Sequence, residues 1–365
     1  MKIGILTFNC VFNYGAVIQA FALQNELESD GHNVEMIDLQ LDRLKENYKL
    51  LNLTNFAFSN KCIIQFLSEV KKIPCRVIRY LKFNRDVHQL LNLTESKYRT
   101  IEELIDGNLD HDVFVCGSDQ IWNPQIFNGP NPIFFADFAK PNQRKISYAA
   151  SIGVENIDKN FIEDYVKYIN HLDNISVREI EAKEEFQNLI KNDISIVLDP
   201  VFLLKKEQWA KLITKQIEAS KYILIYMLRY DKELLDLATN ISKERNLKIV
   251  IIGERSRSFR GDNIKYYSTA GPLDFLNLFF YSSSIVTNSF HGTAFSIIFE
   301  KEIFTFANDK RNSRIINLMN KLDLGNRIVN SSNDFKKGPI DYTKVNKLLG
   351  VERKKSIEFL KKAVN

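Results

Sequence analysis

The stretch that decides the fold class is MKIGILTFNCVFNYGAVIQAFALQNELESDGHNVEMIDL, residues 1–39. Apolar side chains dominate residues 2–8, which is typical of a strand buried on both faces of a parallel sheet. A loop of turn-forming residues follows. Residues 16–28 then place apolar side chains at helical spacing, and Gly31 ends the helix. Residues 34–39 form a second apolar run. Strand, helix and strand in this order predict a parallel α/β domain.

The same alternation covers most of the remaining chain. Between about residues 42 and 110, polar and apolar side chains mix without the short apolar runs of strands, which predicts a helical insertion interrupted at Pro74. Asp199-Pro200 marks a natural boundary between two halves. Further strands are predicted at 112–116, 145–150, 175–178, 194–198, 222–228, 248–252, 284–287 and 302–306, and helices at 159–172, 179–189, 232–245, 272–281 and 291–299.

We therefore predict two α/β domains with an active-site cleft between them. The first spans residues 1–199 and includes the insertion, the second spans residues 200–310, and a helical tail over 311–365 is expected to pack back on the first domain. Ligands of such folds bind beyond the carboxyl ends of the strands. Functional side chains are therefore expected in the loops that lead from a strand to a helix.

Composition excludes several classes of protein. The apolar fraction of 45% and the charged fraction of 26% are those of a globular chain. The longest apolar run, residues 222–228, is far shorter than the roughly 20 residues of a membrane-spanning helix, and no signal peptide is recognisable, so a cytoplasmic protein is expected. A net charge of +5 is too small to indicate nucleic acid as a partner. The cysteines and histidines show none of the spacings of a metal site.

Two loops of the first domain are rich in polar side chains. Residues 9–16 (NCVFNYGA) join the first strand to the first helix, where free N–H groups can hold an anion and Gly15 allows close approach of a ligand; the alternative is a plain helix cap. Residues 117–124 (GSDQIWNP) suit a sugar, with a carboxylate and amides for the hydroxyls and Trp122 for the apolar ring face. The alternative is a polar turn with a core tryptophan.

Two further loops carry a cation and a titratable base. Arg178 follows a short strand, and its guanidinium fork suits a carboxylate or a phosphate; the alternative is an ion pair with Glu179 or Glu181. His291 opens a helix among small polar neighbours in TNSFHGTA (287–294). A histidine at a helix N-terminus tends to have a lowered pKa, which favours proton transfer near neutral pH. The alternative is a structural histidine without a chemical role.

Taken in order, these motifs resemble the polysaccharide pyruvyl transferase family, over Met1 to about Arg327. The resemblance implies two Rossmann-like domains in a GT-B-like arrangement, with the acceptor on the first domain and the donor on the second. It also implies a bacterial enzyme of capsule or exopolysaccharide synthesis, which transfers the pyruvyl group of phosphoenolpyruvate to a sugar as a cyclic ketal. Phosphoenolpyruvate is then a co-substrate, and no cofactor or metal is expected. The motifs are NYGA (13–16), GSDQIWN (117–123), SYAAS (147–151), SVRE (176–179), LDP (198–200) and NSFHGTA (288–294).

The chemistry implied by the resemblance assigns roles to individual residues. His291 would be the acid or acid–base, and Asp119 would orient or deprotonate the acceptor. Other branches of the family carry an arginine two residues before this histidine, where this chain has Ser289, so a cation from elsewhere must bind the donor. Donor-binding candidates are Arg178, Ser289, Asn288, Gly292, Arg229 and Arg314, with Arg255, Arg257, Lys310 and Arg311 as further cations, and acceptor-binding candidates are Asn13, Tyr14, Gly15, Gln120, Trp122 and Asn123.

The basic stretch from Lys61 to Arg85 has two interpretations. Charge runs are most often solvated helical arms. Its interleaved apolar side chains also suit anionic lipid headgroups, which would bring the protein to the inner membrane face beside a lipid-linked oligosaccharide acceptor. Two other functions stay open. One is a glycosyltransferase with Glu254, Arg255 and Arg257 at the diphosphate of a nucleotide sugar, and the other is a non-catalytic glycan-binding subunit.

Overall fold

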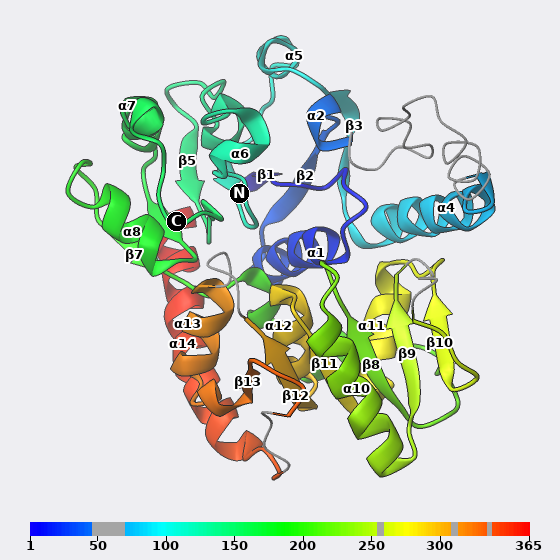
Figure 1. The fold of residues 1–365 in the computed structure, drawn as a ribbon. Coiled ribbons are helices and arrows are strands. Elements are labelled where there is room, and N and C mark those ends of the chain that lie inside the picture. The colour runs from blue at the N-terminus through cyan, green and yellow to red at the C-terminus, as the bar shows by residue number, and fades with distance from the viewer. Residues whose placement is uncertain (46–69, 254–258, 308–312, 334–337) are drawn as a thin grey trace.

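The computed structural model describes residues 1–45, 70–253, 259–307, 313–333 and 338–365. The chain forms two halves, each built on a parallel sheet with helices packed on its faces (Figure 1). The predicted fold class, α/β with two Rossmann-like domains in a GT-B-like arrangement, is confirmed.

The first sheet contains five parallel strands with the order β3-β2-β1-β4-β5. The chain order reverses between β1 and β4, so the loops after these two strands border a topological switch point. A two-stranded parallel pair continues this layer through the bridges Ile146–Asn174 and Ala150–Val177. The strands are β1 (Lys2–Leu6), β2 (Asn33–Leu39), β3 (Leu93–Tyr98), β4 (Val113–Cys116), β5 (Arg144–Ser147), β6 (Ile175–Val177) and β7 (Ile194–Ile196).

The second sheet contains six parallel strands with the order β10-β9-β8-β11-β12-β13. They are β8 (Tyr222–Tyr226), β9 (Lys248–Ile252), β10 (Ile264–Tyr267), β11 (Ser284–Thr287), β12 (Glu302–Phe306) and β13 (Ile328–Val329). The two strands that the sequence does not predict, β10 and β13, are the edges of the sheet. Since β13 belongs to this sheet, the second domain extends beyond the predicted boundary at residue 310.

Helices cover both sheets and fill the junction between them. One hydrophobic cluster runs through both halves and includes Val17 of the first and Phe275 of the second. The α-helices are α1 (Tyr14–Ser29), α2 (Asp42–Lys45), α4 (Ile73–Leu90), α5 (Ile101–Asp106), α6 (Pro124–Phe127), α7 (Lys159–Ile169), α8 (Ile180–Phe186), α9 (Lys206–Ala210), α10 (Lys232–Arg245), α11 (Pro272–Tyr281), α12 (Phe290–Ile298), α13 (Ser313–Lys321) and α14 (Tyr342–Val364), and the 3₁₀ helices are η2 (Pro132–Phe135), η3 (Pro200–Phe202) and η5 (Gly325–Arg327).

The insertion predicted at about 42–110 is only partly helical. Residues 93–98 form β3, which pairs with β2 and extends the first sheet. The sequence hides this strand because LTESKY lies at an edge and is mostly polar or exposed. Pro74 occupies the first turn of α4, where a missing N–H costs nothing, and a turn at residues 71–72 separates this helix from the helical residue Val70, so the predicted break lies just before Pro74. Residues 61–69 of the basic stretch lie outside the described part of the chain.

The basic side chains at the centre of α4 face the protein. The Nη2 of Arg79 donates to the carbonyl oxygen of Phe12, and Lys82 forms an ion pair of 2.7 Å with Asp274 on α11. Buried Asp86 accepts a hydrogen bond from the backbone N–H of Leu273 at the start of α11. The contact of Arg79 holds α4 against the loop after β1, and those of Lys82 and Asp86 join it to the second domain, so Arg79 and Lys82 already have partners within the protein.

The C-terminal helix α14 spans both halves of the molecule (Figure 1). Near its start, Tyr342 Oη lies 3.4 Å from the carbonyl oxygen of Ser296 in the second domain. Further along, Ser356 Oγ accepts a hydrogen bond from the backbone N–H of Leu198, and at the end the carbonyl oxygen of Val364 accepts one from Arg144. The tail therefore ties the second domain to the first. Among the described helices, none has the length and apolar character needed to cross a membrane.

Candidate active site

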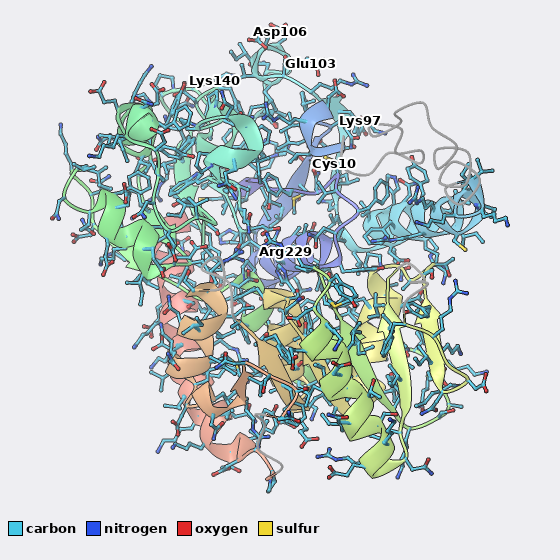
Figure 2. All side chains as sticks on the ribbon, in the orientation of Figure 1. Cys10, Lys97, Glu103, Asp106, Lys140 and Arg229 are labelled. Carbon is cyan, nitrogen blue, oxygen red and sulfur yellow. The ribbon has the colours of Figure 1, made fainter. Side chains whose placement is uncertain are left out.

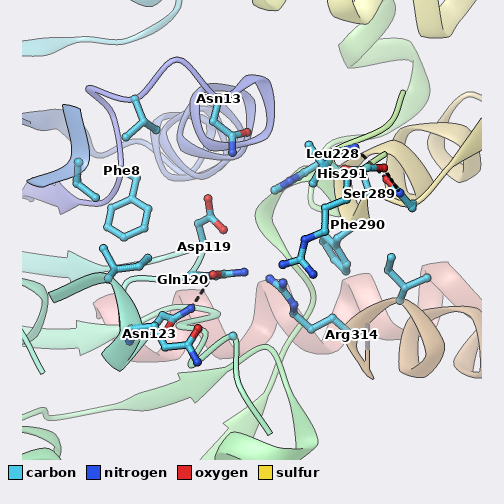
Figure 3. A pocket seen from close by; sticks show the side chains of 18 of the residues that line it. Phe8, Asn13, Asp119, Gln120, Asn123, Leu228, Ser289, Phe290, His291 and Arg314 are labelled. Carbon is cyan, nitrogen blue, oxygen red and sulfur yellow. Dashed lines mark hydrogen bonds between the residues drawn. The ribbon is translucent and has the colours of Figure 1, made fainter. Parts of the chain in front are cut away.

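A cavity of about 820 Å³ lies between the carboxyl ends of the two sheets, within the range of small-molecule sites. The loops after β1 and β4 form one wall, and those after β8 and β11 form the opposite wall (Figure 3). Figure 2 places Arg229 at this junction, whereas Glu103 and Asp106 lie on α5 at the far end of the first domain. The predicted site residues that line the cavity are Asn13, Asp119, Gln120, Asn123, Arg229, Asn288, Ser289, His291 and Arg314.

Five predicted site residues do not line this cavity, and packing explains each. They are Tyr14, Gly15, Trp122, Arg178 and Gly292. Trp122 is fully buried: its ring stacks on Phe135 with centroids 5.0 Å apart, and its Nε1–H donates to the carbonyl oxygen of Phe134. The prediction that this indole stacks on a sugar is therefore wrong, and the alternative of a core tryptophan holds.

Replacing Trp122 by alanine is expected to destabilise the fold by about 3–5 kcal/mol, because it empties a core position and leaves a carbonyl without its donor. Urea unfolding followed by circular dichroism measures this loss. Trp122→Phe, which keeps a ring against Phe135, should cost less. Unchanged stability together with weakened sugar binding would contradict the core assignment.

Tyr14 and Gly15 shape the site from behind. The Tyr14 ring stacks on Phe275 of α11 at 5.1 Å, and its hydroxyl donates to the carbonyl oxygen of Ala270, so it joins the domains and does not bind a sugar. At Gly15 a Cβ atom would lie 2.1 Å from Nδ1 of His291. The helix α1 starts at Tyr14, two residues earlier than predicted, because Asn13 Oδ1 accepts hydrogen bonds from the N–H groups of Gly15 and Ala16.

His291 lies in the first turn of α12, next to the cavity. Ser289 caps this helix, since its Oγ accepts a hydrogen bond from the N–H of Gly292. Gly292 packs tightly against Thr287, and its N–H is used in this cap, so its predicted contact with the donor is wrong. Burial lowers the pKa of His291, and the carboxylates of Asp199 and Asp119 oppose that shift. The free protein therefore favours the neutral imidazole.

Arg178 lies at the centre of a buried cluster of carboxylates behind the cavity wall. Its Nη1 is 2.5 Å from Asp199, its Nη2 is 3.8 Å from Asp119, and its Nε is 3.9 Å from Glu179. The side chain is 3% exposed. The alternative role predicted for Arg178, an ion pair with Glu179 or Glu181, is thus present for Glu179, together with Asp119 and Asp199. Glu181 instead lies near Asn317. Nε and Nη2 have no hydrogen-bond partner among the described residues.

Glu179 is the second buried acid of this cluster. Its Oε1 accepts a hydrogen bond from Ser151 and lies 3.8 Å from Nε of Arg314. Burial raises the pKa of Glu179, although Arg178 and Arg314 favour its ionised form. Two guanidiniums and three carboxylates therefore form one cluster, and Asp199 of this cluster lies 3.7 Å from Nε2 of His291.

Arg314 is the cation that reaches from this cluster into the cavity (Figure 3). Its Cζ lies 6.0 Å from the ring centroid of Phe290, and that of Arg178 lies 4.7 Å from the same ring. Its Nη1 and Nη2 lie 3.0 and 2.6 Å from Gln120 when the amide oxygen of that residue faces them. Arg314 comes from α13, far along the chain from the motif of His291, so its place beside Phe290 could not be inferred from spacing.

Two exposed apolar side chains in the cavity were missed by sequence reasoning. Leu228 and Tyr230 follow β8 and are 58% and 65% exposed, although both line the cavity. Asn288 holds this loop: its Oδ1 accepts from the N–H of Leu228, and its Nδ2 donates to the carbonyl oxygen of Arg229. The amide oxygen and the amide nitrogen of Asn288 are thereby both used inside the protein. These two hydrogen bonds fix the loop that carries Leu228 and Tyr230, so Asn288 has a supporting role.

Glu254, Arg255 and Arg257 of the predicted nucleotide-binding alternative, and the predicted donor cations Lys310 and Arg311, lie outside the described part of the chain. In the part described, no group of three or more His, Cys, Asp or Glu side chains could hold a metal ion.

Comparison with models of known families identifies the chain. Residues 13–310 match polysaccharide pyruvyl transferase, which is most of the sequence. The chain belongs to this family. Search of curated proteins finds no match.

Three solved structures with a similar course of the chain share little sequence identity with it. A UDP-GlcNAc 2-epimerase from Methanocaldococcus jannaschii shares 12% identity at a TM-score of 0.47, over 97% of this chain and 93% of that one. A UDP-N-acetylglucosamine 2-epimerase from Rickettsia bellii shares 14% at 0.46, over 100% and 97%. The spinosyn forosaminyltransferase SpnP shares 11% at 0.45, over 98% and 94%. Likeness at this level carries no inference about the substrate or reaction of this member of the pyruvyl transferase family.

Within this member of the family, Ser289 has a structural explanation. A serine at this position caps α12, and an arginine could not replace its Oγ as the acceptor for the N–H of Gly292. The cations beside Phe290 are the guanidiniums of Arg178 and Arg314.

Proposed function

We propose that this protein transfers the pyruvyl group of phosphoenolpyruvate to two hydroxyls of one sugar, forming a cyclic ketal on a capsule or exopolysaccharide precursor. The observation that carries the proposal is the convergence of an imidazole with two guanidiniums at one end of a cavity. The imidazole is that of His291, and the guanidiniums are those of Arg178 and Arg314. The opposite wall of that cavity is lined by amides and a carboxylate.

The donor requires positive charge, because phosphoenolpyruvate carries about three negative charges near neutral pH. Arg314 lines the cavity, and behind it Arg178 has two nitrogens without a hydrogen-bond partner in the part of the chain that the structure describes. Their ring contact with Phe290 holds both guanidiniums on the same side of the cavity. Arg229 adds a third cation on the loop that Asn288 fixes.

The chemistry begins with protonation of the methylene carbon of the donor, for which His291 is the proposed acid. The resulting cationic centre at C2 is attacked by one sugar hydroxyl. Phosphate then leaves with its bridging oxygen, and a second hydroxyl of the same sugar closes the ketal ring. Asp119 is the proposed base for the hydroxyl protons, since it lines the cavity and lies 3.8 Å from Nη2 of Arg178. Positioned acids and bases of this kind contribute about 10²–10⁴-fold each.

The acceptor would lie between the two walls. Asn13, Gln120 and Asn123 offer hydrogen-bonding groups on the first domain, as predicted. Leu228 and Tyr230 on the second domain take over the role proposed for Trp122, because an exposed ring in a cavity can pack against the apolar face of a sugar. A lipid-linked oligosaccharide is the acceptor we propose.

Replacing Arg314 by alanine should weaken phosphoenolpyruvate binding about 10–150-fold, which corresponds to the loss of roughly 1.5–3 kcal/mol of charge-assisted hydrogen bonding. Calorimetric titration of the donor into wild type and variant measures it, with Lys232→Ala as an exposed control cation outside the cavity. Arg178→Ala is a poorer test, since it leaves three buried carboxylates without their cation. Binding of UDP-sugars in place of phosphoenolpyruvate would overturn the proposed function and favour a glycosyltransferase.

Replacing Tyr230 by alanine should raise the KM for the glycan acceptor several-fold and leave phosphoenolpyruvate affinity unchanged, because one stacking face is lost without any change at the cations. Phosphate release with glycans extracted from the source cells gives KM, and calorimetry gives the donor affinity. Ile105→Ala, which removes an apolar side chain of comparable exposure on α5, is the matched control. Loss of phosphoenolpyruvate affinity in this variant would contradict the assignment of Tyr230 to the acceptor.

A further inference from the structure

One carboxylate, that of Asp199, faces both groups on which the proposed reaction depends. Its Oδ2 lies 2.5 Å from Nη1 of Arg178 and 3.7 Å from Nε2 of His291. Its Oδ1 accepts a hydrogen bond from the backbone N–H of Val201 at the start of η3. The side chain is completely buried in the segment that connects the two domains. The same oxygen therefore faces a guanidinium of the first domain and an imidazole of the second.

We propose that Asp199 is a positioning residue that makes His291 take up a proton when the anionic donor binds. This inference rests on the proposed function, since it takes phosphoenolpyruvate as the anion. The proton comes from solvent and is held on the imidazole until it is transferred to the methylene carbon of the donor.

The charges around His291 explain the coupling. Asp199 and Asp119 favour the imidazolium, whereas Arg178 and Arg314 disfavour it, and burial adds to the effect of the arginines. In the free protein the two guanidiniums offset the two carboxylates. A bound donor with about three negative charges offsets the guanidiniums in turn, so the carboxylate of Asp199 then acts on the imidazole against burial alone.

The geometry leaves that proton available. Nε2 of His291 is buried and has no hydrogen-bond partner among the described residues. At 3.7 Å from Oδ2 of Asp199, this nitrogen lies within ion-pair distance but beyond hydrogen-bond distance. On the other side of the ring, Nδ1 packs against the backbone at Gly15, where a Cβ would lie 2.1 Å away, so the ring has little freedom to turn. The imidazole can thus be charged in place, and no acceptor among the described residues holds its Nε2 proton.

The test is calorimetric titration of phosphoenolpyruvate near pH 7 in buffers of different ionisation enthalpy, which gives the protons taken up on binding. Wild type should take up about one proton more than His291→Gln, the variant that reports the contribution of the phosphate group itself. Asp199→Asn, which keeps an oxygen for Val201, should bind the donor with the low proton uptake of His291→Gln. Asp106→Asn changes an exposed carboxylate on α5, outside the cavity, and should behave as wild type.

The outcomes separate this inference from the proposed function. Equal proton uptake by wild type and His291→Gln, or full uptake by Asp199→Asn, overturns the role of Asp199 while leaving phosphoenolpyruvate as the donor. Absence of donor binding to wild type overturns both. Where Asp199→Asn does not fold, an NMR titration of the His291 ring in wild type decides: its pKa should rise when phosphoenolpyruvate is bound, and an unchanged pKa contradicts the inference.

Discussion

Replacing His291 by glutamine is expected to lower phosphoenolpyruvate-dependent phosphate release by about 10²–10⁴-fold, the usual contribution of a positioned acid or base. The physical reason is that the imidazole is the one group that the proposed mechanism places next to the methylene carbon with a proton to give. Burial lowers the pKa of His291 although Asp199 and Asp119 oppose that shift, so its imidazolium is a stronger acid than that of a histidine in water. In energy the loss corresponds to about 3–5 kcal/mol of transition-state stabilisation.

Donor binding by the same variant is the control for this prediction. His291→Gln should still bind phosphoenolpyruvate with an affinity within a few-fold of wild type, because the guanidiniums of Arg178 and Arg314 remain. His88→Gln changes an exposed histidine on α4, which does not line the cavity, and should turn over normally. The measurement is phosphate release with extracted glycans as acceptors. Turnover close to wild type in His291→Gln would remove this residue from the mechanism.

Replacing Gly15 by alanine is expected to abolish most of the activity by steric means alone. The added Cβ would lie 2.1 Å from Nδ1 and 2.4 Å from Cγ of His291, distances that no packed atoms share. The start of α1 cannot retreat easily, because Tyr14 stacks on Phe275 and bonds to Ala270. The imidazole must therefore move out of its place, so activity should fall nearly as far as in His291→Gln, with a loss of about 1–3 kcal/mol in the free energy of unfolding.

A double variant distinguishes this contact from a general disturbance of α1. In Gly15→Ala/His291→Ala the methyl group fills space that the ring has left, so the two stability losses should be clearly less than additive. Gly350→Ala is the matched control: it lies in α14 with open space around its Cβ position, and it should keep both activity and stability. Additive losses in the double variant would show that Gly15 and His291 do not compete for the same space.

The position of the site followed from local sequence patterns, but the choice of side chains did not. The motifs around Asp119 and His291 follow buried strands, and the carboxyl ends of those strands meet in the fold, so both line the cavity as predicted. Trp122 stands in the same motif as Asp119 and is buried against Phe135. Nothing in the spacing distinguishes an indole that faces a ligand from one that faces the core, because that depends on elements elsewhere in the chain.

The sequence by itself determined the class of fold and the family. The period of its apolar residues is a local property, and burial on both faces of parallel strands requires that pattern whatever surrounds them. Tertiary structure alone decided which charges meet at the site. Asp199, Arg178 and His291 come from three segments that are far apart in the sequence, and Arg314 reaches Phe290 from α13. Electrostatic coupling falls steeply with distance, so it depends on the few ångströms that packing of the two domains sets.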